Sequence, residues 1–122
     1  MAKLSKRDVG KKGEKIAIEY LKKHGYKIIT TNYLSKVGEI DIIAQEKETL
    51  TFIEVKYRSN TNYGTPLESI NYRKILHICR TAQWYLNEHN WNKDVRFDVI
   101  EIIEQNGEYK IELIRNAFEN PL

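Results

Sequence analysis

The chain has 122 residues, of which 41% are hydrophobic and 30% are charged. These proportions are typical of a globular protein, so they exclude a fibrous or disordered chain, and we expect one domain over residues 1–122. The net charge of +3 is too small to indicate a polyanionic partner by itself, so the positions of the basic residues matter more.

Hydrophobic periodicity and turn residues predict two helices and five strands. The first helix covers 8–24, and Gly25 marks its end. The second helix runs from about Pro66 to His89, with Ile75, Cys79, Ala82 and Leu86 on its apolar side. The predicted strands are 26–33, 38–45, 50–58, 95–103 and 109–115.

This order of elements predicts the fold class. Asn106 and Gly107 form a strong hairpin signal between the last two strands. A long helix between two strands favours a crossover connection, which makes two strands parallel. We therefore expect an α/β protein with a mixed central sheet flanked by helices.

Cellular location follows from features that are missing in the sequence. Cys79 is the only cysteine, which excludes a disulfide framework and a cysteine-rich metal site. No apolar segment follows the basic N-terminal residues, and no apolar run has the length of a membrane span. We expect a cytoplasmic protein without a membrane partner.

Two strand segments carry charges where core residues are expected. Residues 38–44 read GEIDIIA, and residues 52–58 read FIEVKYR. Because side chains alternate across a strand, Glu54 and Lys56 share one face. The same alternation puts Glu39 and Asp41 on one face of the earlier strand, with Ile40 and Ile42 together on the other.

The short connection between these strands predicts a hairpin. With its centre between Lys47 and Glu48, Asp41 lies opposite Glu54 and Glu39 lies opposite Lys56. Three carboxylates and one lysine would then meet on one patch. A shift of one residue in the pairing would separate them.

Clustered carboxylates repel one another, and a divalent cation relieves that repulsion. Asp41 and Glu54 are therefore candidate ligands of Mg²⁺ or Mn²⁺. Lys56 could orient the attacking water or stabilise charge on a phosphate, and Glu39 completes the catalytic candidates. A Glu-x-Lys pair alone is more often a solvated surface pair, but the facing Asp41 favours a hydrolytic site.

Glu14 is a further candidate metal or water ligand. It lies within the apolar arc of the first helix, which contains Ala17, Ile18 and Leu21. The alternative is a glutamate near a helix N-terminus, where the macrodipole favours negative charge.

Basic residues near this site are candidates for contacting DNA phosphates. Arg58 follows the motif strand directly. Arg73 and Arg80 share a stripe of the second helix with His77 and Trp84, and Lys74 is adjacent to it. The alternative for the stripe is a solvated helix face.

The two motifs resemble those of the PD-(D/E)xK nuclease superfamily, which has a restriction-endonuclease-like fold. More narrowly, the chain resembles the YraN-like family, which is related to archaeal Holliday-junction resolvases. The resemblance extends to KKGEKIAIEYLKKHGYKII, to GTPLESI, to the helix with Lys74 and Ala82, and to VRFDVI.

The resemblance implies an αβββαβ core with Asp41, Glu54 and Lys56 as the active-site triad. It also implies the carbonyl of Val55 as a metal ligand. Ile40 stands where the wider superfamily has a proline, as is expected for the narrower family.

The prediction is a Mg²⁺- or Mn²⁺-dependent endonuclease acting on DNA, with branched or irregular DNA as a candidate substrate. One alternative is a nucleic-acid-binding module with a degenerate site, and another is a structural adaptor. The sequence leaves the oligomeric state open between a monomer and a homodimer.

Overall fold

The computed structural model describes residues 6–58 and 70–122. Its helices and strands follow in the order α1 (Lys6–Lys23), β1 (Tyr26–Ser35), β2 (Gly38–Glu46), β3 (Thr49–Arg58), α2 (Tyr72–His89), β4 (Val95–Gln105) and β5 (Glu108–Ile114). All seven predicted elements are present, and their boundaries differ from the predicted ones by a few residues, except at the start of α2.

The strands form one mixed sheet in the order β1-β2-β3-β4-β5. Neighbouring strands are antiparallel except β3 and β4, which are parallel. The chain between β3 and β4 includes α2, as expected for a connection that returns to the same end of the sheet. The predicted α/β class with a mixed sheet is confirmed.

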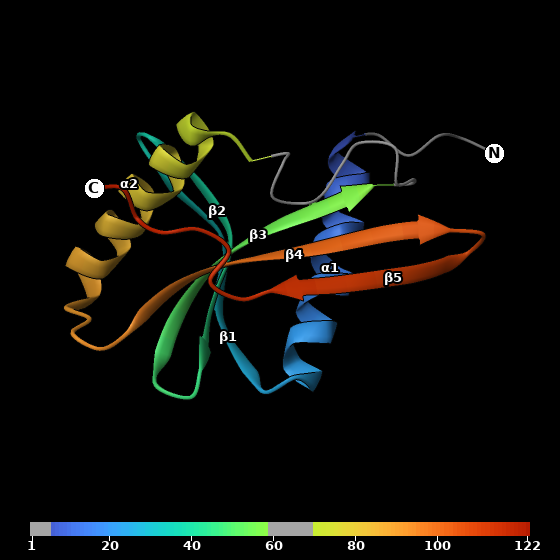
Figure 1. Ribbon diagram of the computed structural model, residues 1–122, viewed down its shortest axis with the longest axis horizontal. Helices are drawn as coiled ribbons and strands as arrows, with labels where there is room; N and C mark the ends of the chain where they lie inside the picture. The colour runs from blue at the N-terminus through green and yellow to red at the C-terminus, as the bar shows by residue number, and fades with distance from the viewer. Residues whose placement is uncertain (1–5, 59–69) are drawn as a thin grey trace.

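Each helix covers its own part of the sheet (Figure 1). In that view α1 crosses behind β3, β4 and β5, whereas α2 lies beside β1 and β2. One apolar cluster joins α1 to the sheet through Ala17, Leu21, Ile42, Ile53 and Ile100. A second cluster joins α2 to the sheet and contains Ile40, Ile43, Phe52, Ile78, Cys79 and Ala82, with Ile75 and Leu86 packed against it. The predicted apolar side of α2 is therefore confirmed.

The N-terminus of α2 is fixed by a side-chain cap. Asn71 has an extended backbone, and its side chain accepts a hydrogen bond of 2.8 Å from the backbone N–H of Lys74. The predicted start near Pro66 is wrong for a continuous helix, because residues 70 and 71 are not helical. Residues 66–69 lie outside the described residues. The predicted end at His89 is confirmed.

Two glycines allow close contact between the helices and the sheet. A Cβ atom on Gly13 of α1 would lie 2.8 Å from the Cβ atom of Tyr57 on β3. A Cβ atom on Gly38 of β2 would lie 3.1 Å from the hydroxyl of Thr81 and 3.3 Å from the Cβ atom of His77, both on α2. Glycine at these positions lets each helix lie close to the strand that it covers.

The predicted faces of β2 are wrong at Ile40. Ile40 packs in the α2 cluster, whereas Ile42 packs in the α1 cluster. The pairing of β1 with β2 skips Asn32 and Asp41, and Asn32 has a left-handed φ of 53°. Ile40 and Ile42 thus pack in different clusters although only Asp41 separates them, so the regular alternation of side chains is interrupted at Asp41.

Within the described part of the chain, neither helix combines the length and the apolar composition that crossing a membrane requires.

Candidate active site

Strands β2 and β3 part at Asp41 and Glu54. The last pair between them is Ile42 with Ile53, which has the predicted register. Beyond it, Ile40 pairs with Tyr33 of β1, and Glu54 pairs with Val99 of β4. We call this point the β2–β3 fork. Figure 1 shows β3 continuing beside β4 while β2 turns away with β1.

Asp41 binds the backbone of β3 across the fork. Its Oδ2 atom accepts a hydrogen bond of 2.9 Å from the N–H of Val55. A side chain thus replaces the backbone acceptor that a continued strand pair would supply. This bond fixes the carboxylate of Asp41 next to the residue that follows Glu54.

Glu54 is the buried acid of the site, with 6% of its surface exposed. Its Oε1 atom lies 3.3 Å from Nζ of Lys74 and 3.9 Å from Nζ of Lys56. Burial raises the pKa of Glu54 to about 7, and the negative charge of Asp41 adds to the rise. The two lysines lower this pKa but do not cancel the effect of burial.

The two lysines reach Glu54 from different elements. Lys56 shares β3 with Glu54, and 28% of its side chain is exposed. Lys74 belongs to the first turn of α2, and 43% of its side chain is exposed. Lys74 was predicted to contact DNA phosphates, and in the structure its Nζ atom lies closer to Glu54 than that of Lys56 does.

Glu14 approaches the fork from α1. Its Oε1 atom accepts a hydrogen bond of 2.8 Å from the side-chain amide of Asn32, the left-handed residue of β1. Burial raises the pKa of Glu14, and the charges of Asp41 and Glu39 raise it further. The predicted inward orientation therefore brings Glu14 within electrostatic range of both carboxylates.

The predicted pairing of Glu39 with Lys56 is wrong. Glu39 is exposed and pairs with Leu34 of β1. Lys56 pairs with Glu101 of β4 instead. The reason is the fork, because β2 and β3 have separated before they reach these residues.

Arg58 lies at the end of β3 and forms an ion pair with Glu101. Its Nη2 atom is 2.8 Å from Oε2 of Glu101, and only 15% of its side chain is exposed. Glu101 was not among the predicted site residues. The available signal was a glutamate inside the apolar run VIEII, where a buried charge requires a partner.

The remaining basic candidates lie on the outer side of α2. Arg73 and Arg80 are exposed, which both the phosphate-binding prediction and the alternative of a solvated helix face require. His77 is half-buried and packs near Gly38, so the predicted stripe is solvated at the two arginines and at Trp84 but less so at His77.

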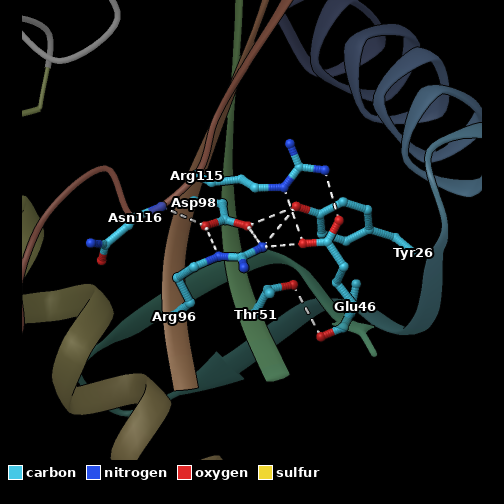
Figure 2. Close-up of polar contacts among 8 residues, drawn as sticks. Tyr26, Glu46, Thr51, Arg96, Asp98, Arg115 and Asn116 are labelled. Atoms are coloured by element: carbon cyan, nitrogen blue, oxygen red, sulfur yellow. Dashed lines mark hydrogen bonds and ion pairs between the residues drawn. The ribbon is translucent and has the colours of Figure 1, made fainter. Parts of the chain in front are cut away.

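A second polar cluster joins the opposite ends of the same strands, and sequence analysis missed it (Figure 2). Asp98 is fully buried on β4. It accepts hydrogen bonds from Arg96 at 2.8 and 2.9 Å, from the hydroxyl of Tyr26 at 3.0 Å and from the N–H of Asn116 at 2.9 Å. We call this cluster, completed by Glu46 and Arg115, the Arg96–Asp98 network.

Glu46 connects the two arginines of the network. Its carboxylate accepts hydrogen bonds of 2.7 Å from Arg96 and of 3.0 and 2.7 Å from Arg115. The hydrogen bond from Arg115, followed by that from Arg96, lowers the pKa of Glu46 to about 2. The network contains no acid without a cation, so it is a structural cluster that ties the start of β1 to β4.

The donor atoms at the fork are suited to a hard cation. Within residues 6–58 and 70–122, no three His, Cys, Asp or Glu side chains form a group that could hold a metal ion. Mg²⁺, however, needs only one or two carboxylates because it retains several waters. Asp41 and Glu54 supply two carboxylates whose repulsion a cation would relieve, so these residues fit Mg²⁺ or Mn²⁺.

Known proteins of similar sequence span the same length. The model of the uncharacterised protein family UPF0102 matches residues 13–102. A UPF0102 protein from Clostridium acetobutylicum is 48% identical over 122 residues, covering 98% of this chain and 99% of its own. Another from Caldicellulosiruptor bescii is 45% identical over 116 residues, covering 92% and 98%.

A third relative, the UPF0102 protein from Persephonella marina, is 45% identical over 111 residues, covering 90% of this chain and 92% of its own. The resemblance to the YraN-like family is confirmed by these matches. The chain belongs to the uncharacterised protein family UPF0102.

Proposed function

We propose that the protein is a Mg²⁺- or Mn²⁺-dependent endonuclease that hydrolyses DNA phosphodiester bonds at the β2–β3 fork. The observation that carries the proposal is the meeting of Asp41, buried Glu54 and Lys56 where the two strands part. The relatives' names specify no reaction, so the proposal rests on this site and on the resemblance to PD-(D/E)xK nucleases.

Asp41 and Glu54, with the carbonyl of Val55, would hold the cation. A bound divalent cation supplies Lewis acidity, which activates water and stabilises charge on a phosphate. The hydrogen bond from Val55 to Asp41 orients the first carboxylate before any ligand arrives. Glu14 and Glu39 add negative charge that attracts a cation to the same place.

Lys56 is the best candidate for contact with the reacting phosphate or water. Its ammonium is partly exposed and lies 3.9 Å from the carboxylate of Glu54. Lys74, at 3.3 Å from the same carboxylate, would balance the charge of Glu54 in the absence of a cation. Both lysines make the surroundings of the fork attractive to a phosphodiester.

Arg73 and Arg80 would contact the DNA backbone because they are exposed on α2. Arg58 is better suited to fixing Glu101 beside Lys56, since most of its side chain is buried in that ion pair. The proposed setting is the cytoplasm, and the protein would act as a monomer or homodimer.

A specific observation favours a second candidate, a DNA-binding module without catalysis. Lys56 and Lys74 already place two positive charges within 3.9 and 3.3 Å of the Glu54 carboxylate, where a metal cation would otherwise supply positive charge. The chain would then bind DNA and leave it intact.

A cleavage panel separates the two functions. Linear, nicked, flapped and four-way DNA are incubated with the protein in Mg²⁺, Mn²⁺ or EDTA, alongside Glu54→Gln and the exposed control Glu108→Gln. Metal-dependent cleavage that only Glu54→Gln abolishes supports the nuclease. Cleavage by Glu54→Gln equal to that of the wild type would refute the nuclease. DNA that is retarded in a gel by the protein but stays intact would favour the binding module.

A calorimetric titration with Mn²⁺ tests the cation site directly. The wild type and Glu108→Gln should release or absorb heat on binding, and Asp41→Asn should not, because it removes one of two carboxylate ligands. Undiminished binding by Asp41→Asn would remove the fork as the metal site.

A further inference from the structure

Trp84 lies on the outer side of α2, where half of its surface is exposed. A hollow of ≈ 280 Å³ lies on one side of it, lined also by Val37, Arg80, Gln83, Asn87 and Leu122. A second hollow of ≈ 160 Å³ lies on another side, lined also by Tyr33, Leu34, Ser35, Lys36 and Glu88. The indole is thus an accessible flat surface between two depressions.

The other tryptophan, Trp91, has a structural role that Trp84 lacks. The indole N–H of Trp91 donates a hydrogen bond of 3.0 Å to the carbonyl of Asp94, and its ring packs against the α2 cluster. No hydrogen bond or ring contact of Trp84 is found among the described residues. Packing and local hydrogen bonding therefore explain Trp91 but not Trp84.

Positive charge flanks the exposed indole. Arg80 lines the first hollow and Lys36 lines the second, and both residues are exposed. Glu88 also lines the second hollow, but its carboxylate accepts a hydrogen bond of 2.6 Å from the hydroxyl of Tyr33. A flat apolar ring with a cation on each side is complementary to a base and its neighbouring phosphates.

The same helix connects Trp84 to the fork. Arg73, Arg80 and Trp84 share one side of α2, and Lys74 at its N-terminus reaches Glu54. The rise per helical residue separates Lys74 and Trp84 by about 15 Å along the axis. A strand lying along α2 could therefore contact Trp84 while its phosphates approach the fork.

We infer that Trp84 is a stacking platform for an unpaired base of single-stranded DNA, with Arg80 and Lys36 binding the adjacent phosphates. The inference rests on the proposed function for the identity of the polymer. It adds a substrate class, namely DNA that contains unpaired bases. A second copy of the chain fits the surface less well, because a two-fold interface sets the same patch against itself and would bring the basic residues of both copies together.

Tryptophan fluorescence tests the stacking directly. In Trp91→Phe, Trp84 is the only indole, and titration with a single-stranded oligothymidine in EDTA should quench its emission. In Trp84→Phe, the remaining Trp91 should show little quenching. An abasic strand of the same length carries the same phosphates but no bases, so it should bind without quenching Trp84.

Binding affinities supply the second measurement. Trp84→Leu should weaken the binding of single-stranded DNA about tenfold or more, because base–aromatic stacking is lost. Its affinity for blunt duplex DNA of the same length should change little. Arg80→Gln should weaken binding to both forms and reduce the dependence on salt concentration.

Three results would overturn the inference. They are equal quenching by the abasic strand, unchanged single-strand affinity of Trp84→Leu, and a wild-type dimer that Trp84→Leu converts to a monomer in sedimentation equilibrium. These experiments contain no divalent cation and no cleavage step. A protein that stacks bases but never cuts would refute the nuclease alone, and one that cuts without stacking would refute only the inference.

Discussion

The Arg96–Asp98 network and the β2–β3 fork both bury carboxylates, but they differ in how well hydrogen-bond donors and positive charges balance these carboxylates. In the network, Arg96 and Arg115 donate charged hydrogen bonds to Glu46, and the pKa of Glu46 falls to about 2. At the fork, burial and then the negative charge of Asp41 raise the pKa of Glu54 to about 7, and its lysine contacts are longer. Figure 2 shows how completely the network surrounds its acids with donors.

This difference in charge balance distinguishes a cluster that stabilises the fold from a candidate functional site. A buried carboxylate with enough donors stays charged and holds elements together, whereas one that is buried with few close donors and with a like charge nearby stays costly to ionise. Strongly perturbed acids of the second kind are typical of functional sites, because a substrate or cation can supply the missing charge. The following predictions test this contrast, in order of decreasing effect on stability.

Asp98→Ala should give the largest loss of stability. It leaves Arg96, the hydroxyl of Tyr26 and the N–H of Asn116 without their shared acceptor in a buried site. Breaking such a buried ion pair costs about 3–5 kcal/mol in the free energy of unfolding. Urea denaturation measures the loss, with Glu108→Gln as the exposed control. A loss as small as that of the control would show that the network does not stabilise the fold.

Glu54→Gln should stabilise the protein at high pH, in contrast to Asp98→Ala. Because the folded pKa of Glu54 is raised to about 7, its contribution to stability is present below pH 4.5 and is lost as pH rises through 7. Glutamine does not ionise, so at pH 8 the free energy of unfolding of the variant should be higher than that of the wild type by on the order of 1–3 kcal/mol. Melting curves at pH 5 and pH 8 measure this, and an equal difference at both values would contradict it.

Glu46→Gln should remove a contribution to stability that the wild type itself loses at low pH. The folded pKa of Glu46 is lowered to about 2, so its contribution is present above pH 4.5 and is lost as pH falls towards 2. We expect the variant to be less stable than the wild type at pH 6 by about 1–2 kcal/mol, and the difference to shrink at pH 2.5. Denaturation at the two values checks this, and a constant difference would assign the loss to packing.

Lys56→Arg should change stability least but should still reduce cleavage. Arginine keeps the positive charge beside Glu54, so the free energy of unfolding should change by about 1 kcal/mol or less. Its planar group positions a water or phosphate differently, so single-turnover cleavage should fall sharply while DNA affinity is largely retained. A fully active Lys56→Arg protein would refute the catalytic role of Lys56.

Local periodicity was sufficient to predict most of the framework. Alternation and turn residues identified the five strands, and the short turn after Glu46 fixed the register up to Ile42 and Ile53. The same motifs singled out Asp41 and Glu54 before the structure brought them together at the fork. These features depend on neighbours in sequence, where the geometry of strands and turns leaves few choices.

Tertiary structure decided the features that join distant segments. Packing placed Ile40 on the α2 side of the sheet, and the parting of β2 and β3 separated Glu39 from Lys56. Docking of α2 brought Lys74 to Glu54, and sheet assembly brought Tyr26 to Asp98 across 72 residues. The sequence alone determined which residues are charged and which strands carry them. Which cation faces which carboxylate depends on packing between elements, and no local pattern encodes that packing.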